Sequence, residues 1–325
     1  ENKEAAHKFD DPDLYGIILS GSGDTLKGRH ANTTIPKFLG ALNRYVALKE
    51  VENANEADYL GYAEDFWTLV VENHAYITGG TSDMEHFRGD NELDATRTQA
   101  NCESCCAHNM LKLSKELFKI TGDRKYADYY ENTLRNAIMG AVNKEGAFSY
   151  FTPMATGYYK FFGTADPATN MFWCCTGTGM ENYTKLGDSI YFKDDDSLTV
   201  NQYVASEVTW KEKDLKLTQS SDVTASDKAE FTVNLLNDAQ PVAAKLKLRV
   251  PDWASGDVTV KINGQAAENN VENQYFVIDR TWNNNDKVEI TYPMEVKAFG
   301  LSDNKSVFAF KYGPTVLAAK LGTEK

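Results

Sequence analysis

The five cysteines of this 325-residue chain gather in two short segments. They are Cys102, Cys105 and Cys106 in NCESCC, and Cys174 and Cys175 in FWCC. Paired thiolates with a carboxylate beside them, here Glu103, are groups that bind zinc as ligands in proteins. A disulfide framework is the weaker interpretation, because the count is odd and adjacent cysteines rarely bond to each other. The pattern therefore predicts a metal site.

Two ligand sets fit this pattern. In the first, Glu103 and Cys105 act together with Cys174 and Cys175. Side chains two positions apart point about 200° apart on a helix, so this set needs Glu103 and Cys105 just before a helix and the cysteine pair in another loop. In the second set, Cys102 replaces Glu103 in a Cys-x-x-Cys pattern with Cys105, and the site is purely structural.

A zinc-bound thiolate is deprotonated at neutral pH, and one that faces a cleft can act as a nucleophile. Such a nucleophile needs an acid/base partner, most naturally a carboxylate. Glu85, in the glycine-rich segment TGGTSDMEHFRG, is the candidate, although most loop glutamates are merely solvated. His74 and His108 are interpreted as polar positions near helix ends rather than as ligands.

Hydrophobic periodicity divides the chain near residue 193. Before it, helical spacing predicts helices over residues 34–50, 56–74, 108–122, 124–141 and 179–192. After it, a period of two predicts strands over residues 198–204, 215–219, 229–236, 244–250, 258–262, 274–278, 287–292 and 306–312. We expect a multidomain α-then-β chain, helical over residues 1–192 and an antiparallel β-sandwich over residues 193–325. Thr34 is the predicted cap of the first helix, and the first 30 residues are predicted to be loop.

The net charge of −13 argues against nucleic acid and anionic membrane surfaces as partners. No apolar run approaches the ~20 residues that span a bilayer. The initial segment ENKEAAHKFDDPD lacks the apolar core of a signal peptide. We expect a soluble protein with a neutral ligand, and its compartment stays open between the bacterial cytoplasm, which keeps thiols reduced, and export.

Several segments resemble glycoside hydrolase family 127, the β-L-arabinofuranosidase family. They are TGGTSDMEHF, NCESCCAHNMLKL, ITGDRKYADYYENTLRNAIMG, FSYFTP and FWCCTGTGMENYTKLGDSIYF. The resemblance covers residues 7–192 and continues more loosely through LRVPDWA, VTVKINGQ and FKYGPTVLA, which are similar to the family's first β-sandwich. The combination of Glu-x-Cys, the later cysteine pair and the helix between them is the specific part.

The resemblance implies part of an (α/α)6 helical barrel, a zinc ion held by the first ligand set, and a retaining mechanism with a cysteine nucleophile. By position in the motifs, Cys174 becomes the nucleophile and Glu85 the acid/base. His30, Glu131 and Tyr150 become sugar-contacting residues. The implied reaction releases β-L-arabinofuranose from plant-type glycans or glycopeptides, so the expected partner is a carbohydrate substrate.

Two departures from the family pattern carry further expectations. Well-known members follow the cysteine pair with proline, whereas this chain has Thr176–Gly179, which implies another branch and allows another substrate. The N-terminal half of the family's barrel also has no counterpart here. The resemblance therefore implies part of a longer enzyme, or a second chain or homo-oligomer that completes the barrel.

Two other hypotheses stay open. A conventional carboxylate pair, Glu85 with Glu131, would leave the zinc structural, and Cys174→Ser would then keep much of the activity. A non-catalytic subunit, which binds sugar or is stabilised by zinc, would instead need a partner chain that supplies the missing half of the barrel.

Overall fold

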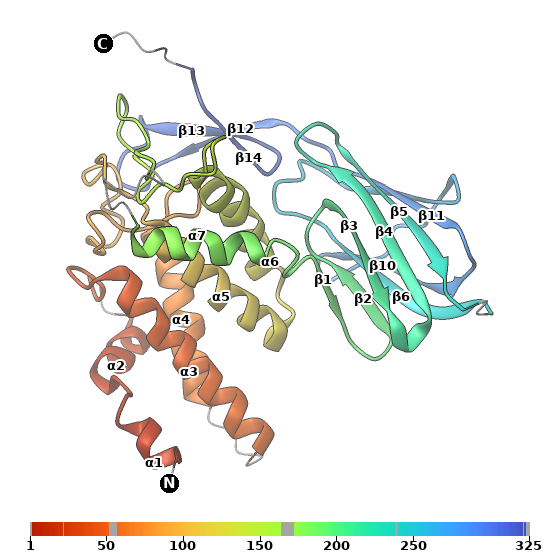
Figure 1. The fold of residues 1–325 in the computed structure, drawn as a ribbon, viewed down its shortest axis with the longest axis horizontal. Helices are drawn as coiled ribbons and strands as arrows, with labels where there is room; N and C mark the ends of the chain where they lie inside the picture. Colours follow the sequence, from red (N-terminus) through yellow and green to blue (C-terminus); the bar gives the residue numbers. More distant parts are fainter. Residues whose placement is uncertain are drawn as a thin grey trace. The chain divides into compact units, whose positions relative to one another are not determined.

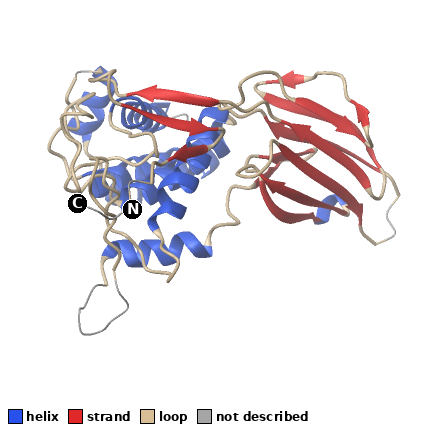
Figure 2. Ribbon diagram, turned by 90° about the horizontal axis from the view of Figure 1, so that it is seen from above, coloured by secondary structure: helices blue, strands red, loops and turns tan. Residues whose placement is uncertain are grey.

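The chain forms helices first and strands afterwards (Figures 1 and 2). The computed structural model describes residues 2–21, 23–51, 57–163, 172–237, 240–320 and 322. Two compact units divide the chain. The first contains residues 1–122, 132–184 and 299–309, and the second contains residues 123–131, 185–298 and 310–325. Within the described residues, no helix combines the length and apolar character that a membrane crossing requires.

The helical elements before residue 185 belong to the first unit, except for residues 124–131, which belong to the second. They are α1 (Asn2–His7), α2 (Pro12–Ser20), α3 (Ala31–Val51), α4 (Ala57–Asn73), α5 (Ser104–Thr121), α6 (Arg124–Thr133), a π-helical turn (Leu134–Ile138), a 3-10 turn (Met139–Ala141) and α7 (Cys174–Thr184). The predicted helices correspond to α3 to α7 with shifted ends, and residue 56 of the second prediction lies outside the described residues. The predicted helix over 124–141 contains a π-helical turn, which its apolar spacing does not reveal.

The N-terminal residues form helices, so the prediction of a loop there was wrong. Asp11 caps α2, because its side chain accepts a hydrogen bond from the Leu14 N–H at 3.2 Å, and Pro12 occupies the first turn. Gly21 ends the helix in the left-handed conformation. Leu14 and Ile18 are buried. The Asp-Pro start signal was therefore present in the sequence and was missed.

The start of α3 also differs from the prediction. The helix begins at Ala31, so Thr34 is not its cap but lies in the first turn, where its hydroxyl donates to the carbonyl of His30 at 2.8 Å. Pro36 lies inside the helix. Proline lacks an N–H and so removes one backbone hydrogen bond, and here the helix continues past that loss.

Three helices, α3, α4 and α5, pack against one another in the first unit (Figure 1). Phe38 of α3 and Phe66 of α4 are buried and stack with ring centroids 3.8 Å apart. The indole N–H of Trp67 donates to the hydroxyl of Ser114 in α5 at 2.8 Å, which satisfies a buried donor. α7 packs against α5 as well, and the sulfurs of Cys105 and Cys175 near the starts of these two helices lie 3.2 Å apart.

The second unit is a β-sandwich, which confirms the predicted order of helices followed by antiparallel sheets. The strands of the described residues are β1 (Tyr191–Lys193), β2 (Ser197–Val200), β3 (Val204–Trp210), β4 (Leu215–Asp222), β5 (Lys228–Leu235), β6 (Val242–Arg249), β7 (Thr259–Ile262), β8 (Gln265–Ala266), β9 (Val271–Glu272), β10 (Tyr275–Trp282), β11 (Asp286–Thr291), β12 (Val296–Gly300), β13 (Phe308–Tyr312) and β14 (Thr315–Leu317). The end of β12 and the start of β13 are assigned to the first unit. The strands form sheets in the orders β1-β2-β6-β10-β9, β3-β4-β5-β11-β7-β8 and β12-β13-β14.

The two larger sheets share one hydrophobic core, to which Leu217 and Phe231 contribute from one sheet and Leu248 and Ile278 from the other. Alternate side chains along β4 and β5 are buried, as the period of two predicts. Strand neighbours in these sheets are antiparallel except β2 and β6, which are parallel. The predicted strand over 198–204 is wrong, because β2 and β3 belong to different sheets.

Candidate active site

Glu85 lies in a tight turn formed by Asp83–His86. The Asp83 N–H donates to the His86 carbonyl at 2.9 Å, and the His86 N–H donates to the Asp83 carbonyl at 3.0 Å. The central residues Met84 and Glu85 have φ angles of +48° and +68°, the pattern of a type I′ turn. Left-handed backbone costs residues other than glycine about 1–2 kcal/mol each, so the turn that presents Glu85 is strained.

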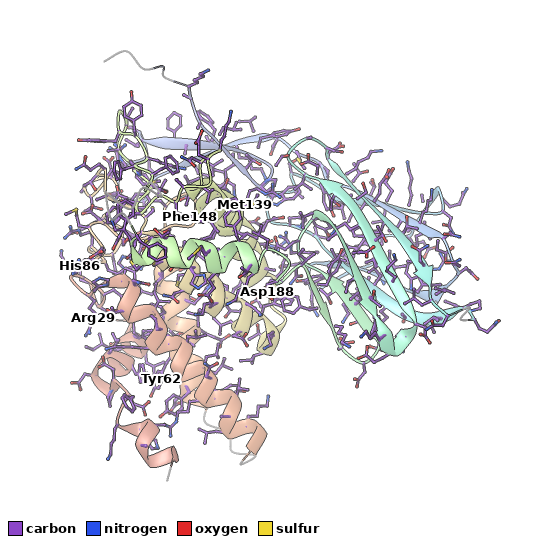
Figure 3. The ribbon with its side chains drawn as sticks, in the orientation of Figure 1. Arg29, Tyr62, His86, Met139, Phe148 and Asp188 are labelled. Atoms are coloured by element: carbon purple, nitrogen blue, oxygen red, sulfur yellow. The ribbon has the colours of Figure 1, made fainter. Side chains whose placement is uncertain are left out.

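Backbone hydrogen bonds fasten one side of this turn to the segment before α3. The Ala31 N–H donates to the Glu85 carbonyl at 2.8 Å, and the Phe87 N–H donates to the Arg29 carbonyl at 3.0 Å. Figure 3 labels Arg29 and His86, which mark these two segments in the helical unit. The pairing carries the side chains on either segment to one place.

Two of the predicted site residues, His30 and Tyr150, contact the Glu85 carboxylate. The His30 imidazole Nε2 lies 3.4 Å from Glu85 Oε2, and both side chains are about one-third exposed. The Tyr150 hydroxyl donates a short hydrogen bond to Glu85 Oε1 and lies 3.6 Å from Cys174 Sγ. Burial, together with the hydrogen bond to Glu85, raises the pKa of Tyr150, so its phenol stays protonated. Tyr150 therefore links the candidate acid/base to the candidate nucleophile.

The first predicted ligand set converges. Glu103, Cys105, Cys174 and Cys175 each offer one ligand atom, and these atoms all lie within 4.8 Å of one another. Glu103 immediately precedes α5, Cys105 lies in its first turn, and the cysteine pair begins α7. Three of these residues are buried and Cys174 is exposed. The group that could hold a metal therefore keeps one thiol accessible.

Two of the three distances around Cys175 match a tetrahedral ion, and the third is shorter. The Cys175 Sγ lies 3.2 Å from Cys105 Sγ, 4.0 Å from Cys174 Sγ and 3.9 Å from Glu103 Oε1. Zinc–sulfur bonds of about 2.3 Å in tetrahedral geometry place neighbouring ligand atoms about 3.8 Å apart. Three thiols and one carboxylate also match the preferences of zinc, so these residues fit the ion that the family resemblance implies.

Burial and close contacts shift the pKa values of the acidic groups in this cluster. Burial raises the pKa of Glu103 and that of Cys174. The hydrogen bond between Cys105 and Cys175 raises the pKa of Cys105 and lowers that of Cys175. A divalent cation among such groups favours the ionised form of each. The crowding of four acidic side chains therefore supports a metal site.

The cysteine pair begins a helix, so the prediction that it lies in a loop was wrong. Gly179 lets this helix approach Phe148, because a Cβ at that position would lie 2.3 Å from the Phe148 ring (Figure 3). The Thr178 hydroxyl lies 3.1 Å from Cys105 Sγ. The segment Thr176–Gly179, which departs from the family's proline, thus supplies a close packing contact and a hydrogen bond to a candidate ligand. Sequence reasoning missed both roles, although the unusual Thr-Gly-Thr-Gly run was a visible signal.

The other two cysteines lie outside the ligand group. Among the described residues, Cys102 is not part of the cluster, so the four-cysteine set is not assembled. Burial raises the pKa of Cys102 and that of Cys106. The Cys106 thiol donates to Glu103 Oε2 at 3.3 Å, which helps to orient that carboxylate.

Glu131 has contacts of a different kind. It belongs to the second unit, where Oε2 lies 2.8 Å from Arg249 Nη2 and accepts a hydrogen bond from the Trp253 indole N–H at 2.7 Å. Its side chain and that of Arg249 are buried. These contacts support a structural role, and a contact between Glu131 and sugar stays a prediction.

The two histidines interpreted as polar positions also have partners. The buried His74 ring lies 3.1 Å from Asp90, and burial lowers its pKa. The His108 Nδ1 lies 2.8 Å from the Asn182 side-chain oxygen. Both rings are held by residues of the helical unit.

Aromatic rings extend from the site toward solvent. The rings of Tyr150 and Trp173 lie 5.7 Å apart, and those of Trp173 and Phe161 lie 5.9 Å apart, measured between centroids. Phe161 and Phe172 are exposed. Trp173 directly precedes the candidate nucleophile, so these rings border its surroundings.

Two family models match this chain, one over the helical part and one over the β-sandwich. Residues 3–188 match the β-L-arabinofuranosidase GH127 catalytic domain, and residues 197–294 match the GH127 middle domain. The chain is 23% identical over 285 residues to a non-reducing end β-L-arabinofuranosidase of Bifidobacterium longum subsp. longum. This alignment covers 79% of the present chain and 41% of the relative.

Solved structures show the same fold. A GH127 β-L-arabinofuranosidase from Geobacillus stearothermophilus T6 aligns with a TM-score of 0.72 and 22% identity over 88% of this chain and 46% of the other. A second GH127 β-arabinofuranosidase aligns with a TM-score of 0.75 and 23% identity over 88% of this chain and 47% of the other. The fold is thus part of an α/α barrel followed by a β-sandwich, and the chain spans less than half the length of these relatives. Because the catalytic domain matches more than half of its residues, the chain belongs to glycoside hydrolase family 127.

Proposed function

We propose that this chain is a retaining glycoside hydrolase that releases β-L-arabinofuranose from plant-type glycans or glycopeptides. Cys174 acts as the nucleophile and Glu85 as the acid/base. The observation that carries the proposal is the connection of these two side chains through the Tyr150 hydroxyl, which contacts both. An accessible thiol and a carboxylate on either side of one hydroxyl are the pair that double displacement requires.

In the first step the Cys174 sulfur attacks the anomeric carbon of the sugar. A carbon–sulfur bond forms while the bond to the leaving oxygen breaks, and Glu85 gives its proton to that oxygen. The product is a sugar joined to Cys174, with Glu85 now ionised. The nearby imidazole of His30 and hydroxyl of Tyr150 can donate hydrogen bonds to the carboxylate in this state.

In the second step water attacks the same carbon from the opposite side. Glu85 takes a proton from the water, the carbon–sulfur bond breaks, and Cys174 leaves as a thiolate. Two inversions restore the original configuration, so the product retains the β form. Glu85 is then protonated again and ready for another cycle.

The proposed cofactor is zinc, held by Glu103, Cys105, Cys174 and Cys175. Bound zinc would keep the thiols ionised near neutral pH. Within the chain, Cys106 and Thr178 contact Glu103 and Cys105 and so hold the ligand side chains in place. Such outer contacts orient ligands in metal sites generally.

Hydrolysis of an aryl β-L-arabinofuranoside tests this proposal. We expect Cys174→Ser and Glu85→Gln each to lower kcat/KM by about 10³-fold or more, with Cys102→Ala as the matched control that retains activity. Intact mass after treatment with a haloacetamide-bearing β-L-arabinofuranosyl reagent should show one adduct, on Cys174. Much activity remaining in Cys174→Ser would instead favour the Glu85 and Glu131 pair.

A second candidate function is a binding subunit that works with another chain. The observation that favours it is that the chain spans 41% of the curated relative. Such a subunit would bind zinc and L-arabinose by calorimetry but release no sugar alone. Activity that appears only when a homo-oligomer or a second chain forms, measured alongside light scattering, would support this alternative.

A further inference from the structure

The turn that presents Glu85 is strained at neighbouring positions. Ser82, Met84 and Glu85 have φ angles of +84°, +48° and +68°. None of them is glycine or asparagine, the residues that adopt this conformation most readily. Met84 is 59% exposed, so its side chain adds little packing that could hold the turn. The restraint must therefore come from other groups.

Asp83 supplies such a restraint through its side chain. The residue is buried, and its Oδ2 accepts two hydrogen bonds from Arg88, from Nε at 2.9 Å and from Nη2 at 2.7 Å. Its Oδ1 accepts from the Thr98 hydroxyl at 2.5 Å and from the Asn101 amide at 3.4 Å. Both carboxylate oxygens are therefore used, by donors that follow the turn in the sequence.

The same donors connect the turn to the segment that leads into α5. The Asn101 side-chain oxygen accepts from the Thr98 N–H at 2.6 Å, which fixes one donor relative to the other. The Met84 N–H donates to the Ala100 carbonyl at 3.0 Å. Asp83 thus fastens the strained turn, by side chain as well as backbone, to residues that immediately precede the candidate ligands.

We infer that Asp83 is a positioning residue for the acid/base step. It acts by holding Glu85 in the strained turn and does not itself touch the substrate. This inference rests on the proposed function. When the Asp83 carboxylate is lost, the turn relaxes toward ordinary φ angles and the Glu85 side chain shifts. Proton transfer needs heavy atoms within hydrogen-bond reach, so protonation of the leaving oxygen slows.

The leaving group provides the test. Dinitrophenol leaves without protonation, whereas phenol needs a proton from the acid. We expect Asp83→Asn to lower kcat/KM on phenyl β-L-arabinofuranoside by about 10²-fold and to change that on the dinitrophenyl glycoside by about threefold or less. Glu85→Gln should show the same pattern with a larger difference between the two substrates.

Asp94→Asn is the matched control, because Asp94 lies in the same loop and also pairs with an arginine, Arg97, at 2.7 Å. It should leave both substrates unaffected. Arg88→Met is a second variant in case Asp83→Asn does not fold, since Arg88 is 41% exposed and its loss leaves the Thr98 and Asn101 contacts in place. It should give the same leaving-group pattern with a smaller effect.

Equal losses on the two glycosides, in Asp83→Asn or in Arg88→Met, would overturn the inference and leave Asp83 with a purely structural role. Failure of the unchanged chain to hydrolyse either glycoside would overturn the proposed function, and the inference with it. A leaving-group dependence in Glu85→Gln but not in the Asp83 and Arg88 variants would leave the proposed function standing and reject the positioning role.

Discussion

The same turn geometry occurs in both units of this protein, but the two turns are built from residues that differ in their tolerance of positive φ angles. In the sandwich, Asn263 and Gly264 join β7 to β8 with φ angles of +49° and +82°. In the helical unit, Met84 and Glu85 adopt +48° and +68°. Asparagine and glycine tolerate this conformation, whereas methionine and glutamate do not. The turn that presents Glu85 therefore carries strain that the Asn263–Gly264 turn avoids.

Charge is distributed differently in the two units as well. The sandwich unit buries Arg249 with Asp128 and Glu131, so its buried charges are compensated within the chain. The ligand cluster of the helical unit consists of four acidic groups, one carboxylate and three thiols. Such a cluster is stable in ionised form only with an added cation. One unit is therefore expected to be self-sufficient and the other to depend on a metal.

Metal removal should have the largest effect on stability, and it should affect the unfolding of one unit and not of the other. Structural zinc contributes about 10 kcal/mol or more in small zinc domains. Dialysis against EDTA should therefore lower the unfolding temperature of the helical unit and leave that of the sandwich unchanged. Calorimetry with parallel zinc analysis measures this, and Cys105→Ala should behave like the stripped protein. An unchanged thermal unfolding curve after complete zinc loss would contradict the prediction.

Breaking the compensated charges should be the next largest effect. Arg249→Met leaves two buried carboxylates without their cation, which costs about 3–5 kcal/mol for a buried pair that loses one partner. The matched control Arg280→Met removes a partly exposed arginine 3.5 Å from Asp286 and should cost under ~1 kcal/mol. Urea unfolding curves compare the two. Similar losses for both variants would show that burial does not govern this network.

Exchanging turn residues tests the comparison directly. Met84→Asn places a residue that tolerates positive φ in the strained turn and should stabilise the helical unit by about 1 kcal/mol. Gly264→Ala should destabilise the sandwich by about 1 kcal/mol, although a Cβ there meets no atom within 4 Å. Thermal unfolding of each variant measures both signs. Destabilisation by Met84→Asn would mean that the turn is not strained as described.

The last effect, which fades in acid, concerns the polar turn before β2. Burial alone would raise the pKa of Asp194, but hydrogen bonds from Ser197 and Asp196 lower it below its ordinary value of 3.8. The stabilisation is therefore present above about pH 4 and is lost as the pH falls further. Asp194→Ala should cost about 1 kcal/mol at pH 7 and progressively less in acid. Unfolding curves at pH 7 and pH 3 compare these values, and an equal cost at both would reject the linkage.

Much of the fold could be predicted from local pattern. Apolar spacing located the cores of α3 to α6, and alternation located most strands, because each pattern reflects one buried face of one element. Ends were less predictable. α7 starts at Cys174, five residues before the predicted start, and its Gly179 packs against Phe148, a contact with a residue 31 positions away that no local pattern encodes.

The amino-acid sequence by itself determined which donors were present: three cysteines and a glutamate of the right kind for zinc, and a loop glutamate with a tyrosine and a histidine in recognisable segments. Only the tertiary structure decided which of the donors meet. Cys105 and Cys175 touch across 70 positions, Cys102 stays out of the group, and Glu131 pairs with Arg249. The reason is physical, since ligand geometry depends on how helices and turns pack, and packing is set by contacts that are distant in sequence.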